Sequence, residues 1–153
     1  MRSIRQAQMD GAEHQTRTRV IALAGNPNAG KTTLFNALTG LRHKVANYPG
    51  VTVERRSGRW TIGEAAAELV DLPGLYSLDA TSMDEEIARD VLRGSPVSPV
   101  NPDAIVAVVD ATNLERNLYL ITQIIEHEKP VVVALTMMDL FEEIGRASCR
   151  ERV

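Results

Sequence analysis

The sequence has one cysteine, no long apolar run and little net charge, and each shortage excludes a class of protein. A lone Cys149 cannot form an intrachain disulfide, which fits a reducing compartment, and we expect the chain to be cytoplasmic. The longest apolar runs, residues 104–109 and 131–135, fall well short of the roughly 20 residues that a membrane-spanning helix needs. Residues 1–19 lack the apolar centre of a secretory signal. A net charge of -3 provides no basic field for nucleic acid, so no nucleic-acid partner is expected.

The order of the remaining patterns predicts one α/β domain. Residues 1–19 are polar without periodicity and are predicted to be a flexible leader. From Val20 onward, short β-type runs alternate with helical stretches, which predicts a mostly parallel sheet flanked by helices. We expect strands at 20–24, 104–109 and 131–135, helices at 31–39, 84–92 and 113–127, and a hairpin that pairs 59–62 with 68–70. A loop through 47–50 should lead into 51–55.

Glycine and serine mark the predicted helix ends. Gly40 is placed to end the first helix. Ser82, with Glu85 three residues later, is placed to cap the second helix at its start.

The last ten residues, 144–153 (IGRASCRERV), differ abruptly from what precedes them. They are basic, and they back-translate without mismatch to the read-through of a common sequencing adapter. We therefore predict that this segment is not native protein and that the biological sequence breaks off at Glu143. Residues 20–143 are then a partial domain, and Cys149 carries no biological information.

A phosphate-loop pattern, G-x-x-x-x-G-K-[ST], stands between the first predicted strand and helix. The candidate nucleotide-binding residues of this loop are Gly25, Asn26, Pro27, Asn28, Ala29, Gly30, Lys31, Thr32 and Thr33. Its backbone N–H groups should surround phosphates, Lys31 should reach the outer phosphates, and Thr32 should bind Mg²⁺. The alternative is a glycine-rich turn that matches by chance, which the flanking strand and helix disfavour.

Two further segments supply candidate magnesium ligands. The segment Asp71, Leu72, Pro73 and Gly74 follows a predicted strand, where ligands of α/β sheets bind, and Asp71 would reach Mg²⁺ through water. Gly50, Val51 and Thr52 lie between the two motifs, and Thr52 would close over the metal and the terminal phosphate as a switch. The alternatives are a plain Asp-Leu-Pro-Gly turn and, for Thr52, a β-branched residue in an edge strand.

A candidate base-reading loop follows the strand at 131–135. It consists of Thr136, Met137, Met138 and Asp139, at the place where a GTPase carries an Asn-Lys-x-Asp loop. Asp139 would accept hydrogen bonds from guanine, whereas Thr136 lacks the amide of asparagine. This difference leaves adenine open as the base, and Asp139 could also be an ordinary aspartate at a strand end.

Taken together, four segments closely resemble the FeoB family of ferrous iron transporters. They are residues 25–33, 47–54 (NYPGVTVE), 71–78 (DLPGLYSL) and 110–118 (DATNLERNL). The resemblance implies a Ras-like GTPase fold that lacks its last strand and helix, and it implies GTP and GDP as ligands. In such proteins a helical domain and a multi-pass membrane region in the bacterial inner membrane follow the GTPase domain, and the domain would regulate iron uptake.

The resemblance also assigns roles that the residues alone do not. The asparagine that matches Asn28 is associated in this family with potassium-stimulated hydrolysis, so Asn28 is a candidate K⁺ ligand and, with Lys31 and Thr52, a candidate catalytic residue. Leu75 stands where Ras-like enzymes carry a water-orienting glutamine, which implies slow intrinsic hydrolysis. The alternatives are a soluble ribosome-assembly GTPase of the Era type and a nucleotide-sensing module without turnover; an oligomer is possible with any of them.

Overall fold

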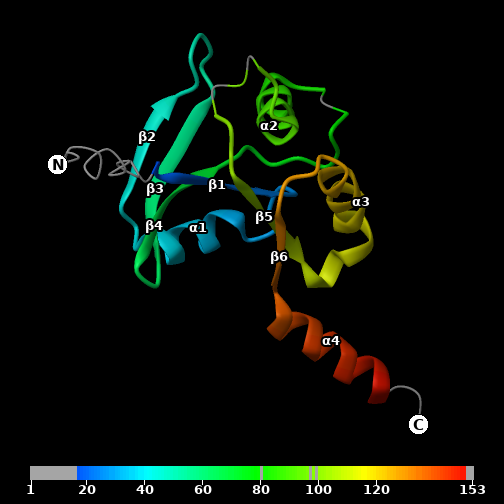
Figure 1. Ribbon diagram of the computed structural model, residues 1–153. Helices are drawn as coiled ribbons and strands as arrows, with labels where there is room; N and C mark the ends of the chain where they lie inside the picture. The colour runs from blue at the N-terminus through cyan, green and yellow to red at the C-terminus, as the bar shows by residue number, and fades with distance from the viewer. Residues whose placement is uncertain (1–16, 80, 97, 99, 151–153) are drawn as a thin grey trace, which may run out of the picture.

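The computed structural model describes residues 17–79, 81–96, 98 and 100–150 (Figure 1). The strands are β1 (Arg19–Gly25), β2 (His43–Asn47), β3 (Glu54–Ile62), β4 (Ala65–Asp71), β5 (Ala104–Asp110) and β6 (Val131–Thr136). The helices are α1 (Lys31–Thr39), α2 (Met83–Arg93), α3 (Leu114–Ile125) and α4 (Met138–Arg150), with a short 3-10 turn, η1 (Ala111–Asn113), before α3.

All six strands form one sheet in the order β2-β3-β4-β1-β5-β6. Strands β4, β1, β5 and β6 are parallel, and β2 and β3 extend the β4 edge as an antiparallel ribbon. The predicted α/β class and mostly parallel sheet are confirmed. Because β1 lies between β4 and β5, the loop that follows β1 begins in the middle of the sheet's carboxyl edge.

Side-chain alternation along β1 divides the core into two layers. Ala22 and Ala24 face the layer that contains α2 and α3, whereas Leu23 faces the layer that contains α1. All three side chains are fully buried, as expected for a strand covered on both faces. The phosphate loop therefore starts from a strand that is fixed on both sides.

The predicted helix ends are confirmed. Helix α1 spans the predicted residues and ends at Gly40, which has a left-handed φ of 61°. Ser82 and Glu85 form the reciprocal capping box of α2, in which each side chain accepts a hydrogen bond from the other residue's backbone N–H. Hydrogen bonds from the backbone N–H and the hydroxyl of Thr81, and more weakly from Ser82, lower the pKa of the Glu85 carboxyl.

The structure corrects the prediction in the first half of the chain. The predicted hairpin forms and turns at Gly63, but it is longer than predicted because β3 runs from Glu54 to Ile62, and residues 59–62 pair with 65–68 rather than with 68–70. Strand β2 was not predicted, and residues 51–53 lie outside any strand. Most of the predicted leader, residues 1–16, lies outside the described residues; Arg17 pairs with Asp103 at 3.0 Å and Arg19 already belongs to β1.

The carboxyl-terminal part of the chain exposes apolar side chains. Strand β6 pairs only with β5 among the described strands, and Val132 and Leu135 are 62% and 52% exposed. Helix α4 extends away from the sheet (Figure 1) and continues past Glu143, so the predicted end of the native sequence stays a prediction. Within the described ranges, no helix combines the length and the apolar character needed to cross a membrane.

Candidate functional site

The phosphate loop connects β1 to α1 through left-handed backbone conformations. Asn28 has φ of 63° and Gly30 has φ of 81°, a region that glycine adopts without strain. Helix α1 starts at Lys31 and no side chain caps its amino terminus. Its first-turn N–H groups are therefore available to an anion, and the helix dipole favours negative charge at this end.

Lys31 and Asp71 form the central ion pair of the site. The Nζ–Oδ1 distance is 2.8 Å, and the side chains are only 11% and 8% exposed. Parallel pairing of β1 with β4 places Leu23 opposite Asp71, and the N–H of Leu72 donates to the carbonyl of Leu23 at 3.1 Å. The sheet register thus brings the predicted phosphate-binding lysine and the predicted magnesium-binding aspartate together.

Gly74, at the end of the Asp-x-x-Gly segment, packs directly against the phosphate loop. A Cβ atom at Gly74 would lie 2.9 Å from Cγ of Pro27 and 3.1 Å from its backbone, closer than real contacts allow. The N–H of Leu75 also donates to the carbonyl of Gly25 at 3.1 Å. The two predicted motifs are therefore in direct contact.

A cavity of about 400 Å³ lies beside Lys31 and Asp71. Its lining includes six of the predicted residues, Lys31, Thr32, Thr52, Asp71, Leu72 and Pro73, and also Val53, Glu54, Arg56 and Asp84. Hydroxyl and carboxylate oxygens are the ligands that Mg²⁺ prefers, so the donor set fits that ion. In the described part of the chain, no three His, Cys, Asp or Glu side chains gather as an alternative metal cluster.

The sequence analysis missed three polar residues of this cavity. Glu54 and Arg56 come from β3 and form an ion pair at 3.0 Å, and Asp84 comes from the first turn of α2. Glu54 ends the 47–54 segment but was given no role at the site, and no motif contains Arg56 or Asp84. The packing of β3 and α2 beside the phosphate loop brings all three here.

The loop that carries Thr52 is anchored by Tyr48. The N–H of Tyr48 donates to the carbonyl of Val53 at 2.9 Å, and the N–H of Val51 donates to the carbonyl of Tyr48 at 3.2 Å. Tyr48 is 2% exposed, and its hydroxyl has no hydrogen-bond partner among the described residues. Burial raises the pKa of this phenol to about 12. Gly50 turns the loop with φ of 78°, so that Thr52 faces the cavity.

A second cavity, of about 460 Å³, continues along the other side of the phosphate loop and shares Lys31 and Thr32 with the first. It is lined by Asn26, Pro27, Asn28, Gly30, Lys31, Thr32, Thr33, Gly74 and Met137. Gly25 and Ala29, the remaining residues of the predicted loop, are buried beneath it. The two adjoining cavities together outline an elongated polar site along the start of α1.

The four residues of the predicted base-reading loop are placed differently from one another. Met137 lines the second cavity. Thr136 points beneath the phosphate loop, where its hydroxyl lies 2.7 Å from the carbonyl oxygen of Ala29. Met138 and Asp139 are exposed in the first turn of α4 and line neither cavity.

A small polar cavity of about 190 Å³ lies between the phosphate loop, Tyr76 and the start of α3. The Arg116 guanidinium lies 4.1 Å from the centre of the Tyr76 ring. Asn26 and Asn117 also line this cavity, and their Oδ1 atoms are buried without a partner among the described residues. Tyr76 follows Gly74 by two residues, so Arg116 connects this segment to α3.

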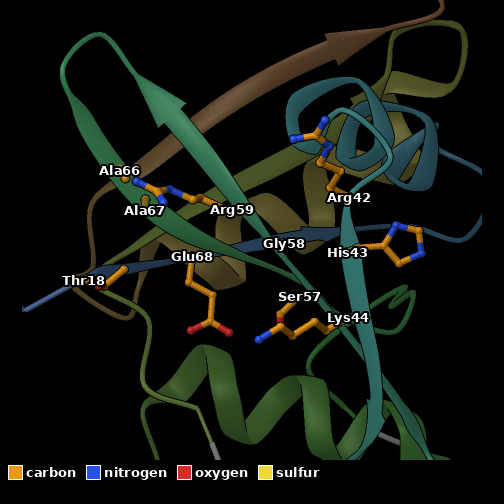
Figure 2. Close-up of a pocket in the computed structure, with 10 residues that line it drawn as sticks. All are labelled: Thr18, Arg42, His43, Lys44, Ser57, Gly58, Arg59, Ala66, Ala67 and Glu68. Atoms are coloured by element: carbon orange, nitrogen blue, oxygen red, sulfur yellow. The ribbon is translucent and has the colours of Figure 1, made fainter.

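Another cavity, about 590 Å³, lies on the β2-β3-β4 ribbon rather than at the phosphate loop (Figure 2). In Figure 2, Lys44 and Glu68 lie on one side of the ribbon and His43 points to the other. His43 packs edge-on against Phe35 of α1, with ring centroids 5.7 Å apart. None of the predicted site residues lines this cavity.

Comparisons with known proteins match the chain to one family. The family profile described as Ferrous iron transport protein B matches residues 19–148. The Fe(2+) transporter FeoB of Legionella pneumophila (strain Lens) is 52% identical over 127 residues, which cover 80% of this chain and 16% of that transporter. The chain thus spans about a sixth of the length of this relative.

Solved structures of FeoB domains match the fold of this chain. The G domain of the T. maritima FeoB iron transporter matches with a TM-score of 0.76 and 44% identity, over 90% of this chain and 83% of that one. The cytosolic domain of T. maritima FeoB in a GDP form matches with a TM-score of 0.77 and 46% identity, over 84% of this chain and 49% of that one.

Proposed function

Because the chain belongs to the ferrous iron transport protein B family, we propose that it binds GTP and GDP with Mg²⁺, hydrolyses GTP and thereby regulates ferrous iron uptake. Its P-loop GTPase fold is that of the FeoB G domain. The observation that carries the proposal is the uncapped start of α1 beside the buried Lys31–Asp71 pair. Family membership also removes the soluble Era-type GTPase as an alternative.

The geometry supports a division of roles along the site. In the proposal, backbone N–H groups of residues 25–33 hold the phosphates, and Lys31 neutralises the outer ones. The hydroxyl of Thr32 would hold Mg²⁺, Asp71 would hold it through water, and Thr52 would hold it when GTP is bound. A metal bound there would neutralise charge on the phosphates. Asp139 reads guanine, and its exposure on α4 requires the base to extend beyond the second cavity.

Hydrolysis in this proposal is slow without a monovalent cation. Leu75, which follows Gly74, is fully buried in the core and cannot orient water. Asn28 is exposed on the left-handed turn of the phosphate loop and lines two of its cavities. A K⁺ ion bound there would supply positive charge to the transition state, as an arginine finger does in other GTPases.

The proposed partners beyond the nucleotide lie outside this chain. We propose that the parent protein continues into a helical domain and a multi-pass region of the bacterial inner membrane, while this segment stays in the cytoplasm, as the cytosolic FeoB structures suggest.

Two substitutions test the proposal. Lys31→Ala should abolish binding of labelled GTP, and unchanged affinity would refute the phosphate-loop assignment. Asn28→Ala should remove the stimulation of phosphate release by K⁺ over Na⁺ while it spares GTP binding. If the parent chain releases phosphate equally in K⁺ and Na⁺, Asn28 has no such role; if it releases none in either salt, the chain is a nucleotide-sensing module.

A further inference from the structure

Thr136 connects three segments of the site through one hydroxyl group. Its Oγ1 lies 2.7 Å from the carbonyl oxygen of Ala29 in the phosphate loop and 3.0 Å from that of Val109 in β5. A Cβ at Gly30 would lie 3.5 Å from the Thr136 side chain. Thr136 therefore sits directly beneath the phosphate loop and supports it from the end of β6.

This position determines what Thr136 can offer to a bound base. A hydroxyl group carries one hydrogen, whereas an amide carries two. Carbonyl oxygens only accept, so the Thr136 hydrogen is committed to Ala29 or Val109, and none remains to be donated elsewhere. An asparagine could support the phosphate loop with one N–H and contact the base with the other. The next side chain, Met137, lines the cavity but has no donor.

Guanine presents different groups on its two edges. N7 is an acceptor on one edge, and the 2-amino group is a donor on the other. Asp139 carries a carboxylate, which accepts from donors and cannot bind N7. We propose that this site reads guanine through its donor edge and leaves N7 unread, and that Thr136 is a positioning residue for the phosphate loop rather than a base-contacting one. The inference rests on the proposed function, because it takes a guanine nucleotide as the ligand.

Nucleotide analogues test the inference without any substitution. In 7-deaza-GTP, a C–H group replaces N7 and the donor edge is unchanged. The chain should bind GTP and 7-deaza-GTP with Mg²⁺ to within about twofold, since no hydrogen bond is lost. A tenfold or larger preference for GTP would overturn the inference while still supporting the proposed function. Absence of GTP binding would overturn both.

Variants at the same position provide the matched controls. Thr136→Asn should create a preference of about five- to tenfold for GTP over 7-deaza-GTP, the value of one added hydrogen bond. Thr136→Val should weaken binding of both nucleotides equally, by about fivefold or more, because it removes the one hydroxyl hydrogen that the carbonyls of Ala29 and Val109 share; Thr136→Ser should restore parent affinity. An asparagine variant without the new preference, or a valine variant with parent affinity, would contradict the inference. If the valine variant does not fold, the asparagine and serine variants decide.

Discussion

Removing the charge of Lys31 should destabilise the chain even without nucleotide. Lys31→Met keeps the apolar stem but leaves the Asp71 carboxylate, which is 8% exposed, without its partner at 2.8 Å. Breaking a buried ion pair on one side costs roughly 3–5 kcal/mol. Because about a tenth of each side chain still reaches solvent, we expect the lower end, about 3 kcal/mol. For a chain of this length, that corresponds to a fall in Tm of roughly 6–12 °C.

Urea unfolding in the absence of nucleotide and magnesium measures this effect. The double variant Lys31→Met/Asp71→Asn should recover at least half of the loss, because it leaves no uncompensated charge. Arg17→Met is the matched control: it breaks an ion pair whose arginine is 71% exposed, and it should cost under about 1 kcal/mol. If Lys31→Met unfolds within 1 kcal/mol of the parent, or if the double variant is no more stable than the single one, the pair does not hold the site together as argued.

Two further predictions concern the segments around the phosphate loop. Tyr48 has a pKa raised to about 12, against 10.0 for a free phenol, so the stability that its neutral form confers is complete below pH 10 and is lost as the pH rises to 12. Relative to Tyr48→Phe, the parent should lose about 2–3 kcal/mol in that window, and parallel alkaline unfolding curves would contradict the burial argument. The Arg116–Tyr76 contact at 4.1 Å should give a coupling of about 0.5–1 kcal/mol in a double-mutant cycle of Arg116→Gln and Tyr76→Leu; additive losses would show that the contact does not connect α3 to the segment after Gly74.

The elements that could be predicted are those with a strong local signal. Strand β5 is an uninterrupted apolar run, and α2 carries both halves of its capping box. Strand β2 has neither kind of signal, because all five of its residues are exposed and no burial pattern distinguishes them from a loop. It is a strand only because β3 offers a free edge for pairing, which is a property of the folded sheet.

The same distinction applies within the site. Lys31 and Asp71 belong to motifs whose chemistry can be predicted from the order of their residues. The sheet then places the two side chains in contact. Asp84 lies at the same cavity because α2 packs with its amino terminus beside β3 and β4, and no spacing along the chain encodes that. Thr136 was predicted at the base, yet its side chain points beneath the phosphate loop. The base-reading role of this loop stays a prediction, and sequence position could not indicate the direction of the Thr136 side chain.

The phosphate loop is the point to which the other site segments are attached. The N–H of Leu75 binds the carbonyl of Gly25, and the hydroxyl of Thr136 binds that of Ala29. The first contact involves the segment that follows Asp71, and the second involves the segment that precedes Asp139. Each hydrogen bond is accepted by a backbone carbonyl of the loop, so neither depends on a loop side chain. A displacement of the loop backbone would therefore move or break both contacts. The segment after Asp71 and the segment before Asp139 are thus connected through the loop, although no hydrogen bond given for the described residues joins the two segments directly.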